Sequence, residues 1–360
     1  MNQNLQKLRA IGQSLWLDNI TRAILDDGTL ARWIGEWGLT GLTSNPSIFD
    51  EAIGSGDAYD AGIADKHATG KSGEALFIEL ALEDLRRAAR LFEPAHAATG
   101  GVDGWVSMEI SPLLAADTVG SIAAARRIHD QAQCRNLFVK IPGTPEGVPA
   151  IEESIYDGVP INVTLLFSTQ QYLASAEAYL RGIERRIAAG RDPVVASVAS
   201  LFVSRWDKAI ASSAPTQLRN GLGIAVGKQA YRAYRELLAS ERWTRLEAAG
   251  ARPQRLLWAS TSTKDPSAPD TLYVEALAAP DTIDTIPEKT LRAFADHGRV
   301  DGVMATDGGD AEQLLQRYAD AGIDTEELAT RLQQEGAAAF VKSWKHLLQR
   351  IEDKAAALQH

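Results

Sequence analysis

Along the chain, short runs of apolar residues alternate with longer stretches in which apolar positions recur at helical spacing. The short runs are rich in β-forming residues and end at glycine, proline or a polar residue, which is typical of strands in a parallel sheet. They predict strands at 15–20, 38–47, 105–112, 137–141, 158–168, 194–205, 255–265 and 282–287. Helices are expected at 4–14, through Trp33 and Trp37, over most of 54–100, at 121–133, 169–189 and 216–249, and after residue 288.

Eight short strands separated by helical segments predict a single (β/α)8 barrel, a TIM barrel, with extra helices. The length of 360 residues fits either one such barrel or two ordinary domains, but no linker or low-complexity run divides the chain. We therefore expect one domain over residues 1–360. Its last part, about 288–360, is expected to be a helical extension that packs on the barrel and ends in a long helix over 325–358.

The charge and the cysteine content limit the possible partners and cellular location of the protein. A net charge of −10 argues against nucleic acid or an anionic membrane as a partner, since both attract an excess of lysine and arginine. Cys134 is the single cysteine, which excludes an intrachain disulfide and fits a reducing compartment. No apolar stretch reaches the roughly 18 residues that a membrane span needs. We expect a soluble, cytoplasmic protein.

Lys140 is the most unusual residue of the predicted strands, because it interrupts the apolar run from Leu137 to Ile141. Taking an ammonium group out of water favours the neutral amine, and a neutral amine can attack a carbonyl to form a Schiff base. The alternative is a lysine at the strand end whose ammonium group reaches solvent past Pro142.

Polar residues recur at the ends of the other predicted strands, where a (β/α)8 barrel carries its catalytic groups. Taken singly, each has a structural explanation: Asp18 could cap the helix after Arg22, and Asn45 before Pro46 is typical of a turn. Their recurrence at successive strand ends favours a common site. The residues in question are Asp18, Asn45, Glu109, Lys140, Asn162, Ser200 and Lys264. Thr164 shares one strand face with Asn162, and Arg205 lies with Ser200 at the exit of its strand.

Six motifs together resemble the transaldolase family, in its longer bacterial form, over essentially the whole chain. They are residues 16–20 (WLDNI), 41–47 (GLTSNPS), 106–109 (VSME), 138–142 (FVKIP), 161–168 (INVTLLFS) and 200–205 (SLFVSR), in the family's order. The resemblance implies transfer of a dihydroxyacetone unit between sugar phosphates of the non-oxidative pentose phosphate pathway. It implies no cofactor and no metal.

The resemblance also implies catalytic roles. Lys140 corresponds to the Schiff-base nucleophile, and Asp18 to the base that takes the proton of the donor's C4 hydroxyl. Glu109 corresponds to an acid/base that acts through a water molecule, which Thr164 helps to hold. Imine formation turns the ketose carbon into an electron sink, so C3–C4 cleavage leaves a stabilised enamine.

Substrate-binding roles are implied for seven more residues, namely Asn45, Asn162, Ser200, Phe202, Arg205, Ser262 and Lys264. The first three correspond to residues that bind the dihydroxyacetone hydroxyls, and the last three to the phosphate site. Lys264 stands where many transaldolases have arginine, so it offers a point charge instead of a bidentate fork. Leu201 stands where shorter transaldolases carry proline.

Other functions are open to the same residues. A fructose 6-phosphate aldolase uses similar chemistry, but that branch has glutamine and tyrosine near the water site, where this chain has Glu109 and Phe202. A metal-dependent aldolase is another alternative, although the histidines (His67, His96, His129, His297, His346 and His360) show no ligand spacing. A third is a non-catalytic binder of sugar phosphates. The sequence is compatible with a monomer or a homodimer.

Overall fold

The computed structural model describes residues 2–358 and contains an eight-stranded parallel sheet. The strand order β2-β1-β8-β7-β6-β5-β4-β3 leaves β2 and β3 at the edges, where a parallel bridge joins Gly41 to Trp105. The sheet therefore forms a nearly closed barrel, and the predicted (β/α)8 fold is confirmed. The strands are β1 (Ser14–Asp18), β2 (Gly41–Thr43), β3 (Val106–Glu109), β4 (Leu137–Pro142), β5 (Ile161–Leu166), β6 (Ser197–Phe202), β7 (Arg255–Ala259) and β8 (Ile283–Ile286).

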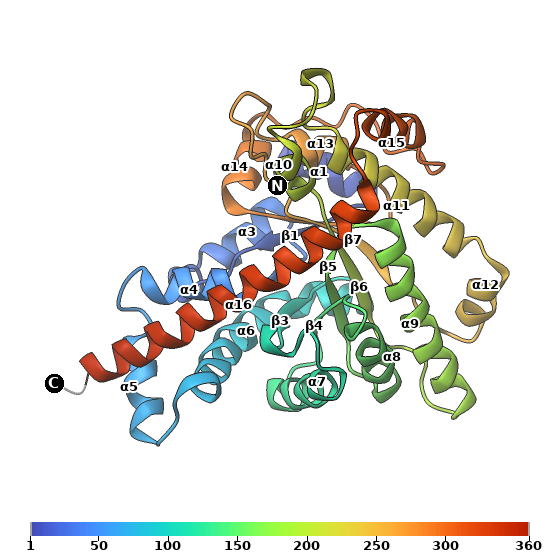
Figure 1. Ribbon diagram of the computed structural model, residues 1–360. Coiled ribbons are helices and arrows are strands. Elements are labelled where there is room, and N and C mark those ends of the chain that lie inside the picture. Colours follow the sequence, from blue (N-terminus) through green and yellow to red (C-terminus); the bar gives the residue numbers. More distant parts are fainter. Residues whose placement is uncertain (1, 359–360) are drawn as a thin grey trace.

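Helices surround the strands, and the last one, α16, runs diagonally across the front of the barrel in Figure 1. Two 3-10 turns, η1 (Pro112–Leu114) and η2 (Thr216–Leu218), lie in connections. The α-helices are α1 (Gln3–Ala10), α2 (Arg22–Asp26), α3 (Thr29–Trp37), α4 (Pro46–Gly54), α5 (Asp60–Ala68), α6 (Gly73–Ala98), α7 (Thr118–Ala132), α8 (Gly147–Asp157), α9 (Thr169–Ala188), α10 (Ser204–Ile210), α11 (Leu222–Leu238), α12 (Glu241–Ala248), α13 (Leu272–Ala276), α14 (Glu288–His297), α15 (Ala311–Asp320) and α16 (Thr325–Ala357).

Several predicted segments are longer than the elements that form. The strand predicted at 255–265 ends at Ala259, because Ser260 has a φ of 58°, outside the extended region. The first helix ends at Ala10, since Gly12, with a φ of 89°, turns the chain toward β1. The helical stretch at 216–249 divides at Ser240, whose hydroxyl accepts a hydrogen bond from the Trp243 N–H and caps α12.

Three aromatic rings from neighbouring strands and the segment before β3 fill part of the core. Phe138 stacks on Trp105 with 4.1 Å between ring centroids, and Trp16 lies 6.0 Å from Phe138. A Cβ at Gly41 would lie 2.6 Å from the Trp16 ring and 2.7 Å from the Trp105 carbonyl oxygen. Glycine at this position therefore lets the two edges of the barrel approach over the indole ring.

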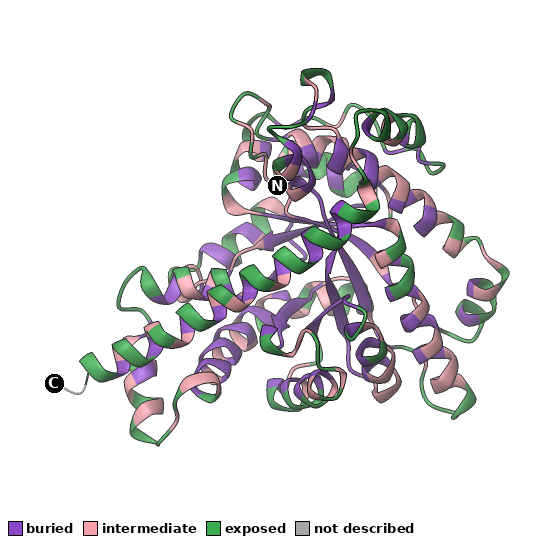
Figure 2. Cartoon of the chain, in the orientation of Figure 1, coloured by how far each residue is buried: buried purple, intermediate pink, exposed green. Residues whose placement is uncertain are grey.

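Helix α16 carries an apolar face that packs on the helices beside β2 and β3, and Figure 2 shows buried and exposed positions alternating along it. Trp344 meets Phe77 of α6 edge to face, with 5.2 Å between ring centroids, and Phe77 meets Phe49 of α4 in the same way. Arg350 adds an ion pair to Asp50 of α4 at 2.8 Å. These contacts fix the extended C-terminal helix against the barrel.

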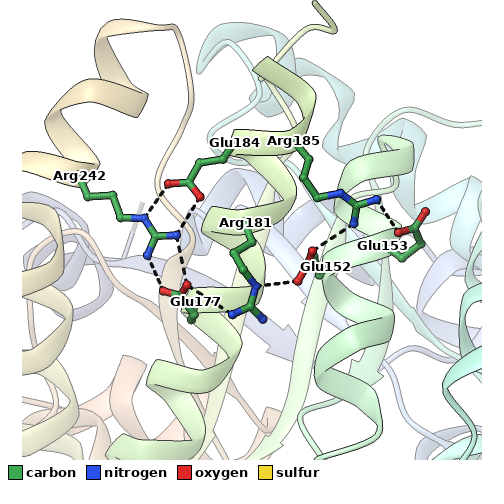
Figure 3. A network of polar contacts seen from close by, with 7 residues as sticks. All are labelled: Glu152, Glu153, Glu177, Arg181, Glu184, Arg185 and Arg242. Atoms are coloured by element: carbon green, nitrogen blue, oxygen red, sulfur yellow. Dashed lines mark hydrogen bonds and ion pairs between the residues drawn. The ribbon is translucent and has the colours of Figure 1, made fainter. Parts of the chain in front are cut away.

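Arginine and glutamate side chains join α8, α9 and α12 on the outside of the barrel, as Figure 3 shows. Arg242 of α12 pairs with Glu177 and Glu184 of α9. Arg181 and Arg185 of α9 continue the network to α8, where they pair with Glu152 and Glu153. Because these groups are partly exposed, each pair adds only about 0–1 kcal/mol, and the network serves mainly to set the spacing of the three helices.

Asp284 is an unexpected carboxyl group in the middle of β8. It is fully buried, and its Oδ1 accepts a hydrogen bond from the Thr261 hydroxyl at 2.9 Å. Its Oδ2 has no hydrogen-bond partner among the described residues. Burial raises the pKa of Asp284 to about 8, so the carboxyl is protonated in the folded protein at neutral pH.

We predict that Asp284→Asn removes a pH-dependent loss of stability. Between pH 5 and 7, roughly, the native protein holds a proton on Asp284 that the unfolded chain releases, so the free energy of unfolding falls as pH rises, by at most about 1.4 kcal/mol per pH unit. Asparagine cannot ionise. The free energy of unfolding of the variant minus that of the wild type should therefore increase with pH in urea titrations, whereas Asp301→Asn, at an exposed position, should give a flat difference. A flat difference for Asp284→Asn would mean that Asp284 is ionised in the native state.

Candidate active site

A cavity of about 120 Å³ opens at the carboxyl ends of the strands. Nine of the residues singled out in the sequence line it: Asp18, Asn45, Lys140, Thr164, Ser200, Phe202, Arg205, Ser262 and Lys264. The other two, Glu109 and Asn162, are bonded to members of this set. The barrel thus brings all eleven predicted residues together, although they are spread over about 250 positions of sequence.

Lys140 lies inside the barrel and does not extend to solvent. It is 5% exposed, and its Nζ lies 3.3 Å from Glu109 Oε2. The ammonium group also donates a hydrogen bond to the Ser44 carbonyl oxygen at 2.9 Å. Glu109, Lys140 and Asn162 are register partners across β3, β4 and β5, so they stand at one level of the barrel. The contacts with Glu109 and Ser44 fix the position of the Lys140 nitrogen at the cavity.

Asn162 connects this level to β6. Its Oδ1 accepts a hydrogen bond from the Ser200 hydroxyl at 2.7 Å, and its Nδ2 donates to Ser107 Oγ at 3.2 Å. Two residues farther along β5, Thr164 is fully buried, and its hydroxyl has no hydrogen-bond partner within residues 2–358. Buried hydroxyls are normally paired, so this one is available to a ligand in the cavity.

Asp18 ends β1 beside a pair of threonines. The Thr43 hydroxyl donates to Asp18 Oδ1 at 2.9 Å and lies 2.7 Å from the Thr285 hydroxyl. The N-cap of α2 is Thr21, so the helix-capping alternative for Asp18 is wrong. Asn45, by contrast, does cap a helix: its Oδ1 accepts a hydrogen bond from the Ile48 N–H at 3.0 Å, which leaves its amide nitrogen to the cavity.

Burial changes the acid–base properties of both carboxyl groups near Lys140. Loss of water raises the pKa of Asp18 and of Glu109, and the positive charge of Lys140 opposes the rise in each case. Carboxyl groups with raised pKa values exchange protons more readily near neutral pH than exposed ones do, which suits acid–base catalysis.

Two further cationic groups, Arg205 and Lys264, line the cavity. The Arg205 guanidinium lies over the rings of Phe202 and Phe340, 5.0 and 5.8 Å from their centroids. No carboxylate among the described residues lies within ion-pair distance of Arg205, and desolvation lowers the pKa of this group. Lys264 donates a hydrogen bond to the Ser262 hydroxyl, and both lie in the loop after β7 instead of in the strand.

Phe340 and Gln333 of α16 take part in this site although they were not predicted. Phe340 lines the cavity, and the buried Gln333 side chain donates hydrogen bonds to the Gly143 and Leu165 carbonyl oxygens at 2.9 and 3.0 Å. These carbonyls follow β4 and lie in β5, close to Lys140 and Thr164. Helix α16 thus supplies one wall of the site. Thr43 and Thr285 in strands, and Ser44 directly after β2, were also missed, because threonine and serine at such positions have no distinctive pattern.

A polar cavity with a buried lysine and two carboxyl groups at the carboxyl ends of the strands places the chain among the (β/α)8-barrel enzymes. Comparison with known proteins identifies the enzyme family. The chain belongs to the transaldolase/fructose-6-phosphate aldolase family, whose family model matches residues 15–351.

Relatives named transaldolase match nearly the full length of the chain. The identity is 43% over 366 residues to the transaldolase of Thermobifida fusca (strain YX), a match that covers 99% of this chain and 100% of the relative. It is 44% to the transaldolase of Arthrobacter sp. (strain FB24), with 99% of each chain covered. It is 39% to transaldolase 2 of Nostoc punctiforme, with 99% and 98% covered.

Two further observations concern a metal site and a membrane span. Histidine, cysteine, aspartate and glutamate form no group of three that could hold a metal ion within residues 2–358, and His360 lies outside the described residues. Among the same residues, we find no helix whose length and apolar character would let it span a membrane.

Gln333→Leu should weaken the attachment of α16 to the barrel. The variant leaves two buried carbonyl groups without their donor, and each such loss costs about 1–3 kcal/mol of stability. Gln334→Leu is a matched control, because Gln334 is exposed and surface substitutions usually change stability by no more than about 0.5 kcal/mol. The free energies of unfolding from urea titrations check this prediction, and similar values for the two variants would contradict it.

Proposed function

We propose that this protein is a transaldolase that moves a dihydroxyacetone unit from sedoheptulose 7-phosphate or fructose 6-phosphate to glyceraldehyde 3-phosphate or erythrose 4-phosphate. The observation that carries the proposal is the buried Lys140 beside Glu109, in the cavity that also holds Asp18 and Arg205. The relatives that share the chain's full length are named transaldolase, which favours transfer over simple cleavage.

In this proposal, Lys140 attacks the C2 carbonyl of the donor, and loss of water gives an imine that is protonated on nitrogen. Glu109, at 3.3 Å from Nζ, is placed to accept and return protons during these steps, through a water molecule that the free Thr164 hydroxyl also contacts. The protonated imine then draws electrons from the C3–C4 bond.

Cleavage of that bond requires the C4 hydroxyl to lose its proton, which we assign to Asp18. The Thr43 hydroxyl orients the Asp18 carboxylate. The electron pair of the broken bond forms the enamine, and the aldehyde leaves. The enamine attacks the carbonyl carbon of the acceptor, Asp18 returns a proton to the new hydroxyl, and water releases the product from Lys140.

Substrate contacts complete the assignment. We assign the dihydroxyacetone hydroxyls to Asn45 and Ser200, which line the cavity, and to Asn162, which accepts a hydrogen bond from Ser200. The phosphate is assigned to Arg205, with Ser262 and Lys264 beside it. Arg205 has no carboxylate partner among residues 2–358, so its N–H donors are available to a phosphate. This supports the assignment. Phe202 packs under the guanidinium and keeps it in place.

We further propose that the protein is cytoplasmic, because its single cysteine, Cys134, fits a reducing compartment. Fractionation of the source cells tests this location. The cavity is lined by residues of one chain, so the site is compatible with a monomer or a homodimer. Light scattering distinguishes the two.

A turnover assay separates transfer from cleavage. With fructose 6-phosphate and erythrose 4-phosphate, we expect formation of sedoheptulose 7-phosphate and glyceraldehyde 3-phosphate. Without an acceptor, we expect little free dihydroxyacetone, because the enamine waits on Lys140 for an aldehyde. Rapid release of dihydroxyacetone without an acceptor would assign the chain to the aldolase branch, and absence of any turnover would favour a binding protein.

Asp18→Asn should stop carbon–carbon cleavage but not imine formation. Asparagine keeps the shape of the side chain and removes the base, whose contribution to rate is typically about 10²–10⁴-fold. Borohydride should then trap the uncleaved six-carbon phosphate on Lys140, which peptide mass spectrometry distinguishes from the three-carbon adduct of the wild type. A three-carbon adduct formed at a near-normal rate would show that Asp18 is not the base for cleavage.

A further inference from the structure

A second cavity, of about 310 Å³, adjoins the catalytic one. Lys264 lines both cavities, so it forms part of the boundary between them. The second cavity also contains the side chains of Lys208 and Arg219, together with two acids, Asp207 and Asp265. Its walls come from α10, the segment after it and the loop after β7, all of which lie beyond the carboxyl ends of β6 and β7.

The cations of the two cavities form a continuous series. Arg205 and Lys208 are three residues apart on α10, which places them on one face of the helix. Arg205 lines the catalytic cavity, Lys208 lines the second cavity, and Lys264 lines both. Positive charge therefore extends from the site assigned to the substrate phosphate into the neighbouring cavity.

The cations of the second cavity, Lys208, Arg219 and Lys264, have no ion-pair partner among residues 2–358. This is unusual in a chain with a net charge of −10. By comparison, Lys228 and Arg232 each pair with an acidic residue. Loss of water, followed by the positive charges of Lys208 and Arg205, lowers the pKa of Lys264, and the charge of Asp18 opposes this change. The three cations outnumber the two acids of the cavity, and the charge of Arg219 acts on the ionised Asp265. Lys208 and Lys264 repel one another, and an anion between them would reduce that repulsion.

The two acids of the cavity are engaged by other groups. The Asp207 carboxyl accepts hydrogen bonds from the Leu222 and Gly223 N–H groups and from the Tyr273 hydroxyl. The Asp265 carboxylate accepts from Asn220 at 2.8 Å and from Ser267 at 2.6 and 2.9 Å. These hydrogen bonds hold both acids in the walls, and neither acid lies within ion-pair distance of Lys208, Arg219 or Lys264, whose donors can therefore reach a ligand.

We propose that this cavity is a second phosphate subsite, in which Lys208, Arg219 and Lys264 receive the terminal phosphate of the seven-carbon donor. The inference rests on the proposed function. Every donor presents its C2 carbonyl to Lys140, so the phosphate of a seven-carbon ketose lies one carbon farther from Lys140 than that of a six-carbon ketose. Arg205 then serves both donors, whereas Lys208 and Arg219 distinguish the longer one.

The test compares the two donors on the same variants. Without an acceptor and at limiting donor, the rate at which borohydride-trappable adduct forms on the enzyme is measured with sedoheptulose 7-phosphate and with fructose 6-phosphate. For Lys208→Gln, and more strongly for the double variant with Arg219→Gln, the ratio of the seven-carbon rate to the six-carbon rate should fall about ten-fold or more, because a charge-assisted contact is lost for one donor only.

Two controls define the outcome. Lys7→Gln, on α1 and outside both cavities, removes the same charge and should leave the ratio as in the wild type. Arg205→Gln should slow both donors. An unchanged ratio in the Lys208 and Arg219 variants, with normal adduct formation, would overturn the subsite and leave the transaldolase proposal intact. No adduct with either donor in the wild-type enzyme would overturn the proposed function itself.

Discussion

The buried pair of Lys140 and Glu109 is the interaction on which the rest of the site depends. Removing a cation and a carboxylate from water costs several kcal/mol per ion, and their mutual attraction offsets this only when the remaining donors and acceptors are also satisfied. The Ser44 carbonyl oxygen satisfies one of the Lys140 donors, and register pairing across β3 and β4 fixes the two side chains at one level. The closed barrel supplies the rigid frame that keeps this pair in place.

The site combines this frame with contributions from distant parts of the chain. Strands β1, β3, β4 and β5 supply the groups assigned to chemistry, whereas α10 and the loop after β7 supply those assigned to phosphate. Helix α16 adds Phe340 under Arg205 and is tied to the barrel by Gln333. The reacting end of the cavity is therefore built on strands, and the charged end is built on more exposed segments, where Lys264 and Lys208 lie.

Much of the fold and of the site could be predicted from the sequence, because parallel strands buried on both faces leave short apolar runs that end in polar residues. Lys140 stood out because a charge in such a run is unusual. Phe340 and Gln333 could not be found in this way, since their roles depend on how a helix some 200 residues after Lys140 crosses the barrel. Asp284 was not singled out in the predicted strand 282–287, because only its complete burial in the structure reveals the raised pKa. The strand predicted through Lys264 was too long because the positive φ of Ser260 has no mark in sequence.

The central claim is that Lys140 is the nucleophile. Reduction with borohydride in the presence of fructose 6-phosphate, followed by peptide mass spectrometry, tests it most directly. We expect a reduced three-carbon adduct on the peptide that contains Lys140, and its loss in Lys140→Met. An adduct on a different lysine, or one that persists in Lys140→Met, would show that Lys140 is not the nucleophile.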